Sequence, residues 1–435
     1  MKILHINTSD IAGGAARAAY RLHQALNQNG AVSTMLVQAK ASDDPAVTGP
    51  SSKITKAIAL MRPSLDMLPL VPYASRKKLF HCAWLPFSGI LNKIKQINPD
   101  IIHLHWIAGG FAAIGEIAEI GAPVIWSLHD MWPFTGGCHY DDDCGRYKTG
   151  CGCCPVLSSG RLNDLSRAVI ARKQRAFDRA CLVAVNGLSS WISDCARKSL
   201  VFSNKRVVNI PNPIDAERYK PLGKQLAKRI LGLNPEKKHV LFGAMNPAGD
   251  ARKGYAELCR ALRKLKTRGV EFIVFGAGKT ASSPEFDFPS HYMGVLHDDV
   301  SLRIVYSAAE VMVAPSLQEN LSNIIMESLA CGTPVVGFDA GGNKDMIDHK
   351  INGYLAAPFD ENDLSGGIDW VLHESGKRRL NPASGGQAAD ECALSPIEKN
   401  ARETVLRKFD SRIVSRQYLA LYNDVLSNSY QVRIK

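Results

Sequence analysis

The sequence predicts an α/β protein with two doubly wound parallel sheets, and three features support this fold class. The chain has 435 residues, enough for two or three domains at ~150 residues each. Short runs rich in Val, Ile and Leu alternate with longer amphipathic stretches, as in parallel sheets covered by helices on both faces. The pattern restarts after Pro211-Asn212-Pro213, a rigid extended segment typical of a domain boundary.

In the first half, the expected strands are short apolar runs, and the expected helices have apolar residues at three- and four-residue spacing. Strands are expected at 2–7, 32–38, 100–106, 123–128 and 182–186, and helices at 15–29, 111–120, 164–179 and 190–198. These elements predict a Rossmann-like domain at residues 1–210.

The same alternation continues in the second half. Strands are expected at 239–244, 270–276, 311–315 and 334–338, and helices at 254–268, 300–308, 322–330 and 363–374. They predict a second Rossmann-like domain at 211–400 and a helical tail at 401–435 that crosses back. Ligands of such sheets bind outside the carboxyl ends of the strands, and with two domains we expect them in the cleft between the domains.

Charge and composition exclude several classes of protein. The formal net charge is +12, but Lys and Arg are spread along the chain, whereas nucleic-acid binders cluster them. We therefore expect no nucleic-acid partner. No run approaches the ~18 apolar residues of a membrane-spanning helix. The first ten residues look like a strand and a turn, unlike a signal peptide, so we expect a cytoplasmic protein.

Two loops that follow expected strands are suited to anions. Gly13 and Gly14 open a helix whose free N–H groups could receive a phosphate, although a plain tight turn explains them equally well. Arg252 and Lys253 also precede a helix, and their cations suit a diphosphate. The alternative for this pair is a solvated surface. Neither GxGxxG nor GxxxxGK[ST] occurs, which argues against nicotinamide enzymes and nucleoside triphosphatases.

Two carboxylates flank the start of the helix expected at 322–330. Glu319 lies in the loop after the strand at 311–315, and Glu327 lies in the helix itself. A phosphate on the helix N–H groups would leave both carboxylates to accept hydrogen bonds from sugar hydroxyls. Either glutamate alone would be interpreted as a solvated helix carboxylate.

This segment and four others resemble the family 4 retaining glycosyltransferases of the GT-B fold. The shared motifs, in family order, are Gly13-Gly14, His103-Leu104-His105, Ser127-Leu128-His129-Asp130, Arg252-Lys253-Gly254 and the Glu-x7-Glu segment that begins at Glu319. They span nearly the whole chain, and the last is the most specific. The resemblance implies two Rossmann-like domains facing a central cleft, an N-terminal one for the acceptor and a C-terminal one for the nucleotide sugar. It points to bacterial exopolysaccharide and lipopolysaccharide glycosyltransferases.

The resemblance also implies roles for single residues. Glu319 would contact the donor sugar, Glu327 the nucleoside ribose, and Lys253 with Arg252 the diphosphate. His129 would contact the sugar near the reacting carbon. The expected catalytic residues are His129, Arg252, Lys253 and Glu319, and the expected donor-binding residues are Gly13, Gly14, Arg252, Lys253, Glu319, Asn320, Leu321 and Glu327.

The implied reaction is retaining transfer of a hexosyl-type sugar from a nucleoside-diphosphate sugar to a glycan or lipid-linked acceptor in surface polysaccharide biosynthesis. Lys253, Arg252 and helix N–H groups would stabilise the leaving diphosphate, so we expect no catalytic metal and no cofactor. Retention in this family resembles front-face attack in which the departing phosphate takes the acceptor proton. We therefore name no protein general base.

His129 directly follows an apolar strand, and this position favours a functional role over a structural one. Asp130 either orients His129 or simply begins the next turn. His103 and His105 share one face of their strand because side chains alternate along it. We expect one of them in the core and His105 nearer the cleft.

A cysteine-rich loop, residues 138–154, comes next. Four of its side chains supply enough thiolates for a structural zinc ion, namely Cys138, Cys144, Cys151 and Cys154. Their spacing is not that of a standard zinc finger, and free thiols or disulfides are the alternatives. In each case we expect this loop to shape the acceptor side of the cleft.

Residues 53–97 interleave Lys and Arg with large apolar residues. This composition favours docking on an anionic membrane surface, which would place the protein on the inner face of the plasma membrane. An ordinary amphipathic helix pair is the alternative.

Two other functions remain open at this point. One is a sugar-nucleotide epimerase or phosphorylase on the same two-domain architecture. The other is a non-enzymatic, basic, zinc-stabilised nucleic-acid-binding protein. Donor-dependent release of a nucleoside diphosphate distinguishes the transferase from the binding protein.

Overall fold

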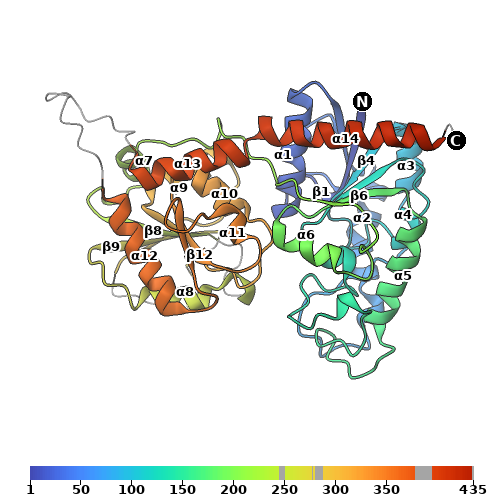
Figure 1. Cartoon of the computed structure of the whole chain (residues 1–435), viewed down its shortest axis with the longest axis horizontal. Coiled ribbons are helices and arrows are strands. Elements are labelled where there is room, and N and C mark those ends of the chain that lie inside the picture. Colours follow the sequence, from blue (N-terminus) through green and yellow to red (C-terminus); the bar gives the residue numbers. More distant parts are fainter. Residues whose placement is uncertain (244–249, 277, 280–287, 378–393, 434–435) are drawn as a thin grey trace. The chain divides into compact units, whose positions relative to one another are not determined.

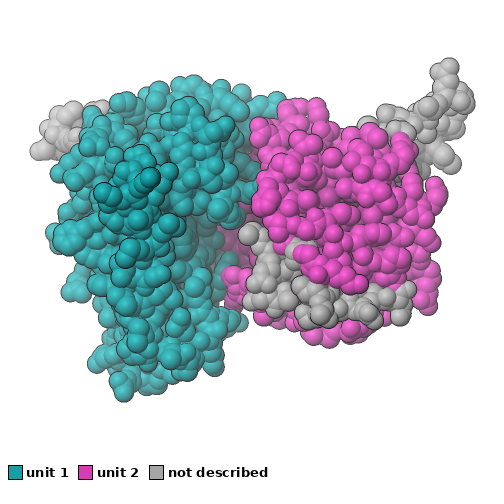
Figure 2. Space-filling model, turned by 180° about the vertical axis from the view of Figure 1, so that it is seen from behind, with its two compact units in different colours: residues 1–213, 411–435 teal, residues 214–410 magenta. Residues whose placement is uncertain are grey.

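The computed structural model describes residues 1–243, 250–276, 278–279, 288–377 and 394–433. The chain forms two compact units, shown in different colours in Figure 2. Unit 1 combines Met1–Pro213 with Ser411–Lys435, and unit 2 is Ile214–Asp410.

Unit 1 contains a seven-stranded parallel sheet with the order β3-β2-β1-β4-β5-β6-β7. The order changes direction between β1 and β4, because β2 and β3 lie on one side of β1 and the later strands on the other. The strands are β1 (Lys2–Ser9), β2 (Val32–Ala39), β3 (Val47–Thr48), β4 (Ile101–Leu104), β5 (Val124–Ser127), β6 (Leu182–Asn186) and β7 (Val207–Val208).

Helices cover both faces of this sheet (Figure 1) because successive strand residues point to opposite faces. Leu4 and Ile102 belong to one apolar cluster and Ile3 and Ile101 to another. The helices are α1 (Gly14–Gln28), α2 (Lys53–Asp66), α3 (Ile90–Ile97), α4 (Ile114–Ile117), α5 (Leu165–Arg179), α6 (Ser190–Arg197) and α14 (Ser411–Arg433).

The last helix, α14, returns to unit 1 and completes its core beside α1. The hydroxyl of Tyr422 lies 2.6 Å from Nδ1 of His103, and the Asn186 amide donates to the hydroxyl of Tyr418 at 2.6 Å. Both tyrosines are buried. The C-terminal helix thus packs back as the sequence predicts. The chain passes from unit 2 to unit 1 after Asp410. The predicted tail begins earlier, at residue 401, which lies inside α13 (Pro396–Lys408).

Unit 2 contains a six-stranded parallel sheet with the order β10-β9-β8-β11-β12-β13, which changes direction between β8 and β11. Its strands are β8 (Lys238–Gly243), β9 (Val270–Phe275), β10 (Ser290–Tyr292), β11 (Val311–Ala314), β12 (Val335–Phe338) and β13 (Gly353–Ala356). Its other helices are α7 (Lys224–Ile230), α8 (Tyr255–Leu262), α9 (Asp299–Ala308), α10 (Asn323–Ala330), α11 (Asn343–Met346) and α12 (Glu361–Ser375).

The predicted fold class, two parallel sheets with alternating helices, is confirmed. The sequence misses the outermost strands β3, β7, β10 and β13, whose short runs have no clear apolar pattern. Of the helix expected at 111–120 only α4 forms. A hydrogen bond from Ala113 N–H to the Glu116 carboxylate at 2.8 Å fixes its start, and residues 118–120 continue in three-residue turns. The expected strand 239–244 ends at a residue outside the described part of the chain. None of the described helices is long and apolar enough to cross a membrane.

Candidate active site

Lys253 and Glu319 meet at the point where the strand order of unit 2 changes direction. Lys253 follows β8, and Glu319 follows β11, the neighbouring strand on the other side of that point. Nζ of Lys253 lies 2.7 Å from Oε2 of Glu319. The side chains are 31% and 15% exposed, so a ligand can reach both. The switch point of an open α/β sheet is where such sheets bind ligands.

Glycines let the loops around this pair pack against one another. Gly254 has φ +67°, and a Cβ there would overlap with the Pro315 carbonyl oxygen. Next to it, the N–H of Leu317 donates to the Arg252 carbonyl at 2.7 Å. A Cβ on Gly341 would likewise overlap with the Glu319 carbonyl. The loops after β8, β11 and β12 therefore form one connected surface at the carboxyl edge of the sheet.

Arg252 is held by a carboxylate of its own loop. Its guanidinium forms two hydrogen bonds with Asp250, Nε to Oδ1 at 3.0 Å and Nη2 to Oδ2 at 2.7 Å. Burial acts to raise the pKa of Asp250, but the hydrogen bonds and charge of Arg252 outweigh it and hold that pKa below its usual value. The structure thus places both cations in one loop, each beside a carboxylate.

The segment between Glu319 and the start of α10 is largely buried. Asn320 is 1% exposed and Leu321 7% exposed. Ser322 caps α10 without a side-chain hydrogen bond, and this fully described helix has no acidic residue in its first turn. The positive end of its dipole therefore keeps the capacity to attract an anion.

Glu327 lies inside unit 2 rather than at its surface. It is 2% exposed, and its Oε2 accepts a hydrogen bond from the hydroxyl of Tyr306 at 2.8 Å. Burial raises the pKa of Tyr306 well above its usual value, and the Glu327 carboxylate adds to that rise. Sequence reasoning places Glu319 and Glu327 together, whereas the structure gives them different surroundings, one accessible and one buried with a tyrosine.

Two buried polar atoms beside this site were not predicted. Oε1 of Gln318, next to Glu319, and Oδ1 of Asn343, after the Gly341-Gly342 turn, have no hydrogen-bond partner among the described residues. The Asn343 amide nitrogen donates to the Phe338 carbonyl at 3.0 Å. A buried acceptor without a partner is costly. Asn343 is 0% exposed, so of the two residues only the partly exposed Gln318 could be approached by a ligand. Their only sequence signal is their place after β11 and β12.

The corresponding edge of unit 1 contains the predicted glycines and histidine. Gly13 has φ +95°, and α1, the next element after β1, begins at Gly14. The Asp10 carboxylate accepts N–H groups from Ala41 and Ser42 and so joins the loops after β1 and β2. His129 follows β5, two strands from β1 in the sheet.

His129 is the outer member of a chain of hydrogen-bonded imidazoles. Its Nε2 lies 3.0 Å from Nδ1 of His105, whose Nε2 lies 3.0 Å from Nδ1 of His5. Burial lowers the pKa of His129 to about 4, while Asp130 acts in the opposite direction. His129 is therefore neutral at pH 7 and has Nδ1 left for another partner. The shared face of His103 and His105 is confirmed, since their rings stack 4.4 Å apart. The structure differs from the expectation in burying both of them rather than one.

Asp130 binds a different histidine. Its Oδ2 lies 2.5 Å from Nδ1 of His139, whose Nε2 lies 2.8 Å from Nδ1 of His81. Sequence reasoning missed this link, because residue 81 lies far from 130 and 139 along the chain. The link ties the loop after β5 to the segment after α2.

Among the described residues, two groups offer ligand atoms within 4.8 Å of one another. One is His5, His103 and His105, inside unit 1. The other is His239, Glu271 and His291, at the amino ends of β8, β9 and β10 and so at the edge opposite Lys253. The four predicted cysteines line a pocket of unit 1.

Comparison with known proteins identifies the family. Residues 12–218 match the family model Glycosyltransferase Family 4, and residues 236–374 match the model Glycosyl transferases group 1. An uncharacterized glycosyltransferase of Methanocaldococcus jannaschii is 27% identical over 351 residues, 77% of each chain. WcaC of Escherichia coli K12, named for colanic acid biosynthesis, is 22% identical over 365 residues, 80% of this chain and 85% of the relative.

Solved structures agree on the fold. The Anabaena protein Alr3699/HepE, crystallised with UDP, superposes with a TM-score of 0.62 at 15% identity, over 98% of this chain and all of the other. Both halves of the chain thus match glycosyltransferase models, in the order that the sequence motifs indicate. The chain belongs to the family 4 glycosyltransferases and has the GT-B fold.

Proposed function

We propose that this glycosyltransferase moves a hexosyl-type sugar, with retention, from a nucleoside-diphosphate sugar to a glycan or lipid-linked acceptor in surface polysaccharide biosynthesis. The observation that supports this best is the 2.7 Å pair of Lys253 and Glu319 at the switch point of unit 2. A cation suited to a diphosphate and a carboxylate suited to sugar hydroxyls lie side by side there.

In this proposal Lys253 exchanges partners when the donor binds. Its ammonium turns from Glu319 to the diphosphate, and the released carboxylate accepts hydrogen bonds from the sugar. Arg252, held by Asp250 at 2.7 Å, supplies a second cation. The N–H groups at the start of α10, after Asn320 and Leu321, add the positive end of a helix dipole. UDP in the crystals of Alr3699/HepE is consistent with a diphosphate ligand for this fold.

Glu327 would contact the ribose, and the Tyr306 hydroxyl at 2.8 Å fixes its carboxylate for that contact. Gln318 offers an acceptor without a partner to donor hydroxyls. Gly13 and Gly14 would receive part of the donor at the start of α1. Substitution of each of these residues tests its assignment, because the affinity for the donor should then fall.

The chemistry requires stabilisation of the negative charge that develops on the departing diphosphate. Lys253, Arg252 and the α10 N–H groups provide fixed positive charge for it, so we propose that catalysis needs no divalent metal. Neutral His129 would donate or accept a hydrogen bond through Nδ1, near the reacting carbon. The departing phosphate would take the acceptor proton, as expected for front-face attack.

An anionic membrane surface is the proposed working site, because α2 leaves large apolar side chains exposed. Ile54 is 73%, Leu60 81% and Met61 60% exposed. Lys53 and Lys56 on the same helix are exposed too. Apolar groups beside lysines suit the interface of an anionic bilayer, where a lipid-linked acceptor would be found.

Liposome flotation tests this surface. The protein should float with anionic vesicles at low salt, and L60E/M61E should remain at the bottom of the gradient. L162E is the matched control, because Leu162 is also strongly exposed, at 60%, but lies in a loop of unit 1 outside α2. Equal flotation of all three proteins would remove α2 as the docking surface.

The transfer reaction is tested by supplying single nucleotide sugars with candidate acceptors and measuring the nucleoside diphosphate released. We expect release that depends on donor and acceptor, persists in a metal chelator, and gives an α-linked product from an α-linked donor. An epimerase would instead return an altered donor sugar without consuming acceptor. Absence of release with every donor would contradict the proposal.

A further inference from the structure

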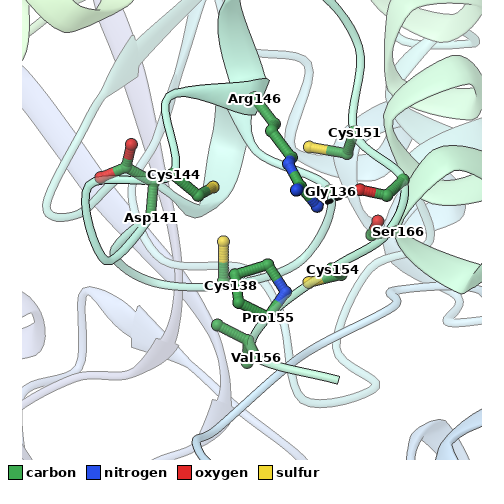
Figure 3. A pocket seen from close by; sticks show the side chains of 11 residues that line it. Gly136, Cys138, Asp141, Cys144, Arg146, Cys151, Cys154, Pro155, Val156 and Ser166 are labelled. Atoms are coloured by element: carbon green, nitrogen blue, oxygen red, sulfur yellow. Dashed lines mark hydrogen bonds between the residues drawn. The ribbon is translucent and has the colours of Figure 1, made fainter. Parts of the chain in front are cut away.

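The loop between β5 and α5 gathers four cysteine side chains at one pocket. Cys138, Cys144, Cys151 and Cys154 all line it (Figure 3). All four are free thiols. Cys153 belongs to the same loop but is not among the lining residues, and its Sγ lies 3.4 Å from the Gly160 carbonyl oxygen. Four cysteines of the loop thus line the pocket, whereas Cys153, which lies between two of them in the sequence, does not.

The four thiols are shielded from water. Burial raises the pKa of each of them, and backbone N–H groups near Cys144, Cys151 and Cys154 offset only part of that rise. A metal ion that binds here must therefore displace the thiol protons.

The turn that carries the last two cysteines is fixed by side chains of its surroundings. The Asp164 carboxylate accepts the N–H of Cys154 at 2.8 Å, and the Arg167 guanidinium donates to the carbonyl of Cys151 at 3.2 Å. Arg146 donates to the Gly152 carbonyl at 2.8 Å. Gly152 has φ +137°, and a Cβ there would overlap with the Leu162 carbonyl. The spacing of Cys151 and Cys154 is thus held in a conformation that needs glycine.

One cationic side chain lies with the four sulfurs. Arg146 lines the same pocket, and its guanidinium donates to the Gly152 carbonyl at 2.8 Å. A zinc ion with four thiolates would have two net negative charges, and the Arg146 guanidinium would offset one of them.

We propose that Cys138, Cys144, Cys151 and Cys154 bind one structural zinc ion. Binding replaces four S–H bonds with four Zn–S bonds and releases four protons. No three of these four sulfurs lie within 4.8 Å of one another in the structure, so the side chains must turn toward one another for each sulfur to come to about 2.3 Å from the ion. The ion would fix the loop that holds His139 against Asp130, at the edge of the sheet where His129 lies.

The test is the metal content of the full-length protein purified under reducing conditions without added metal. We expect about one zinc per chain, as for a four-cysteine site, and less than a tenth of that in C151S and in C154S. C153S is the matched control and should retain its zinc. Zinc below about a tenth of an equivalent in the wild type, or equal loss in C153S, would overturn the proposal.

A second measurement on the wild type alone covers the case in which the variants fail to fold. Alkylation of the native protein should spare the four cysteines until a mercurial reagent releases the metal, and a zinc indicator should report the release. Mass spectrometry without reduction distinguishes the alternatives. Disulfides among the four residues, or four thiols that react at once with no metal released, would each contradict a zinc site.

Discussion

Lys253 and Glu319 form a 2.7 Å ion pair across the switch point of the unit 2 sheet. A partly exposed pair of this kind stabilises a fold by only about 0–1 kcal/mol, so stability does not account for its position. The pair holds a cation and an anion where an α/β sheet binds its ligand. A nucleoside-diphosphate sugar offers the complementary groups, a diphosphate and hydroxyls.

Glu319→Gln should abolish most turnover while leaving the fold intact. The glutamine amide lacks the negative charge with which Glu319 would accept hydrogen bonds from the donor sugar. We expect kcat to fall about 100–1000-fold, as when one group that stabilises the transition state is removed from other enzymes. The melting temperature should stay within a few degrees of wild type. E361Q is the control, since Glu361 pairs with Arg260 and Lys264 at an exposed site. Near-normal turnover of E319Q would refute the assigned role.

Gly254→Ala should separate the loops after β8 and β11. Alanine at φ +67° costs about 1–2 kcal/mol of unfolding free energy, and its Cβ would overlap with the Pro315 carbonyl. Gly232 also has φ +67°, but a Cβ there would have no atom within 4 Å. Urea unfolding should therefore show a larger loss for G254A than for G232A, and only G254A should lose donor binding. Equal losses would contradict the contact.

Tyr306→Phe should destabilise unit 2. The buried Glu327 carboxylate would lose its 2.8 Å hydrogen bond, at a cost of about 1–3 kcal/mol in unfolding free energy. Y354F is the comparison, because the Tyr354 hydroxyl binds the part-buried Asp363 at 2.8 Å, where water can replace it. Urea titrations measure both variants. If Y306F is no less stable than Y354F, the Glu327 carboxylate does not depend on that hydroxyl.

The fold could be predicted because apolar periodicity determines it. Runs such as 182–186 and 311–315 are buried on both faces of a sheet and have few polar residues, so their pattern is clear. The edge strands β3 and β10 have two or three residues and give no such pattern. The position of α14 on unit 1 depends on distant partners such as Tyr422 with His103.

The site could be predicted only in part. The sequence places Lys253 and Glu319 in loops that follow strands. Their contact was not predicted, because it depends on the strand order of the sheet. The partners of Asp130, Arg252 and Glu327 were not foreseen. They depend on side-chain directions within loops and on residues far away in the chain, such as His139 with His81. Neither motif spacing nor hydrophobic period contains that information.

The free energy of unfolding should fall as the pH falls below about 6.5, the pKa of histidine in an unfolded chain. Burial lowers the pKa of His81 and His103 to about 3 and that of His129 to about 4. Between these values and 6.5 the unfolded chain binds more protons than the folded one, so acid favours unfolding. Each histidine contributes up to about 1.4 kcal/mol per pH unit in that range.

Urea unfolding between pH 7.5 and 5 measures this effect. The loss of stability should begin below pH 6.5 and become less steep in H103Q, which removes one of the buried imidazoles. H373Q is the control, since the His373 side chain is 71% exposed, and it should leave the slope unchanged. A flat stability profile in wild type would show that these rings are not buried in neutral form.

Donor binding by the wild type and by K253M tests the central claim most directly. A set of nucleotide sugars is added to each protein and the melting temperature recorded, because a ligand that binds only the folded form stabilises it by about 2.7 kcal/mol at 100 times its Kd. At least one nucleotide sugar should stabilise the wild type, and K253M should lose that stabilisation, whereas K264M, an exposed lysine paired with Glu361, should keep it. Equal stabilisation of wild type and K253M would contradict a donor site at Lys253 and Glu319.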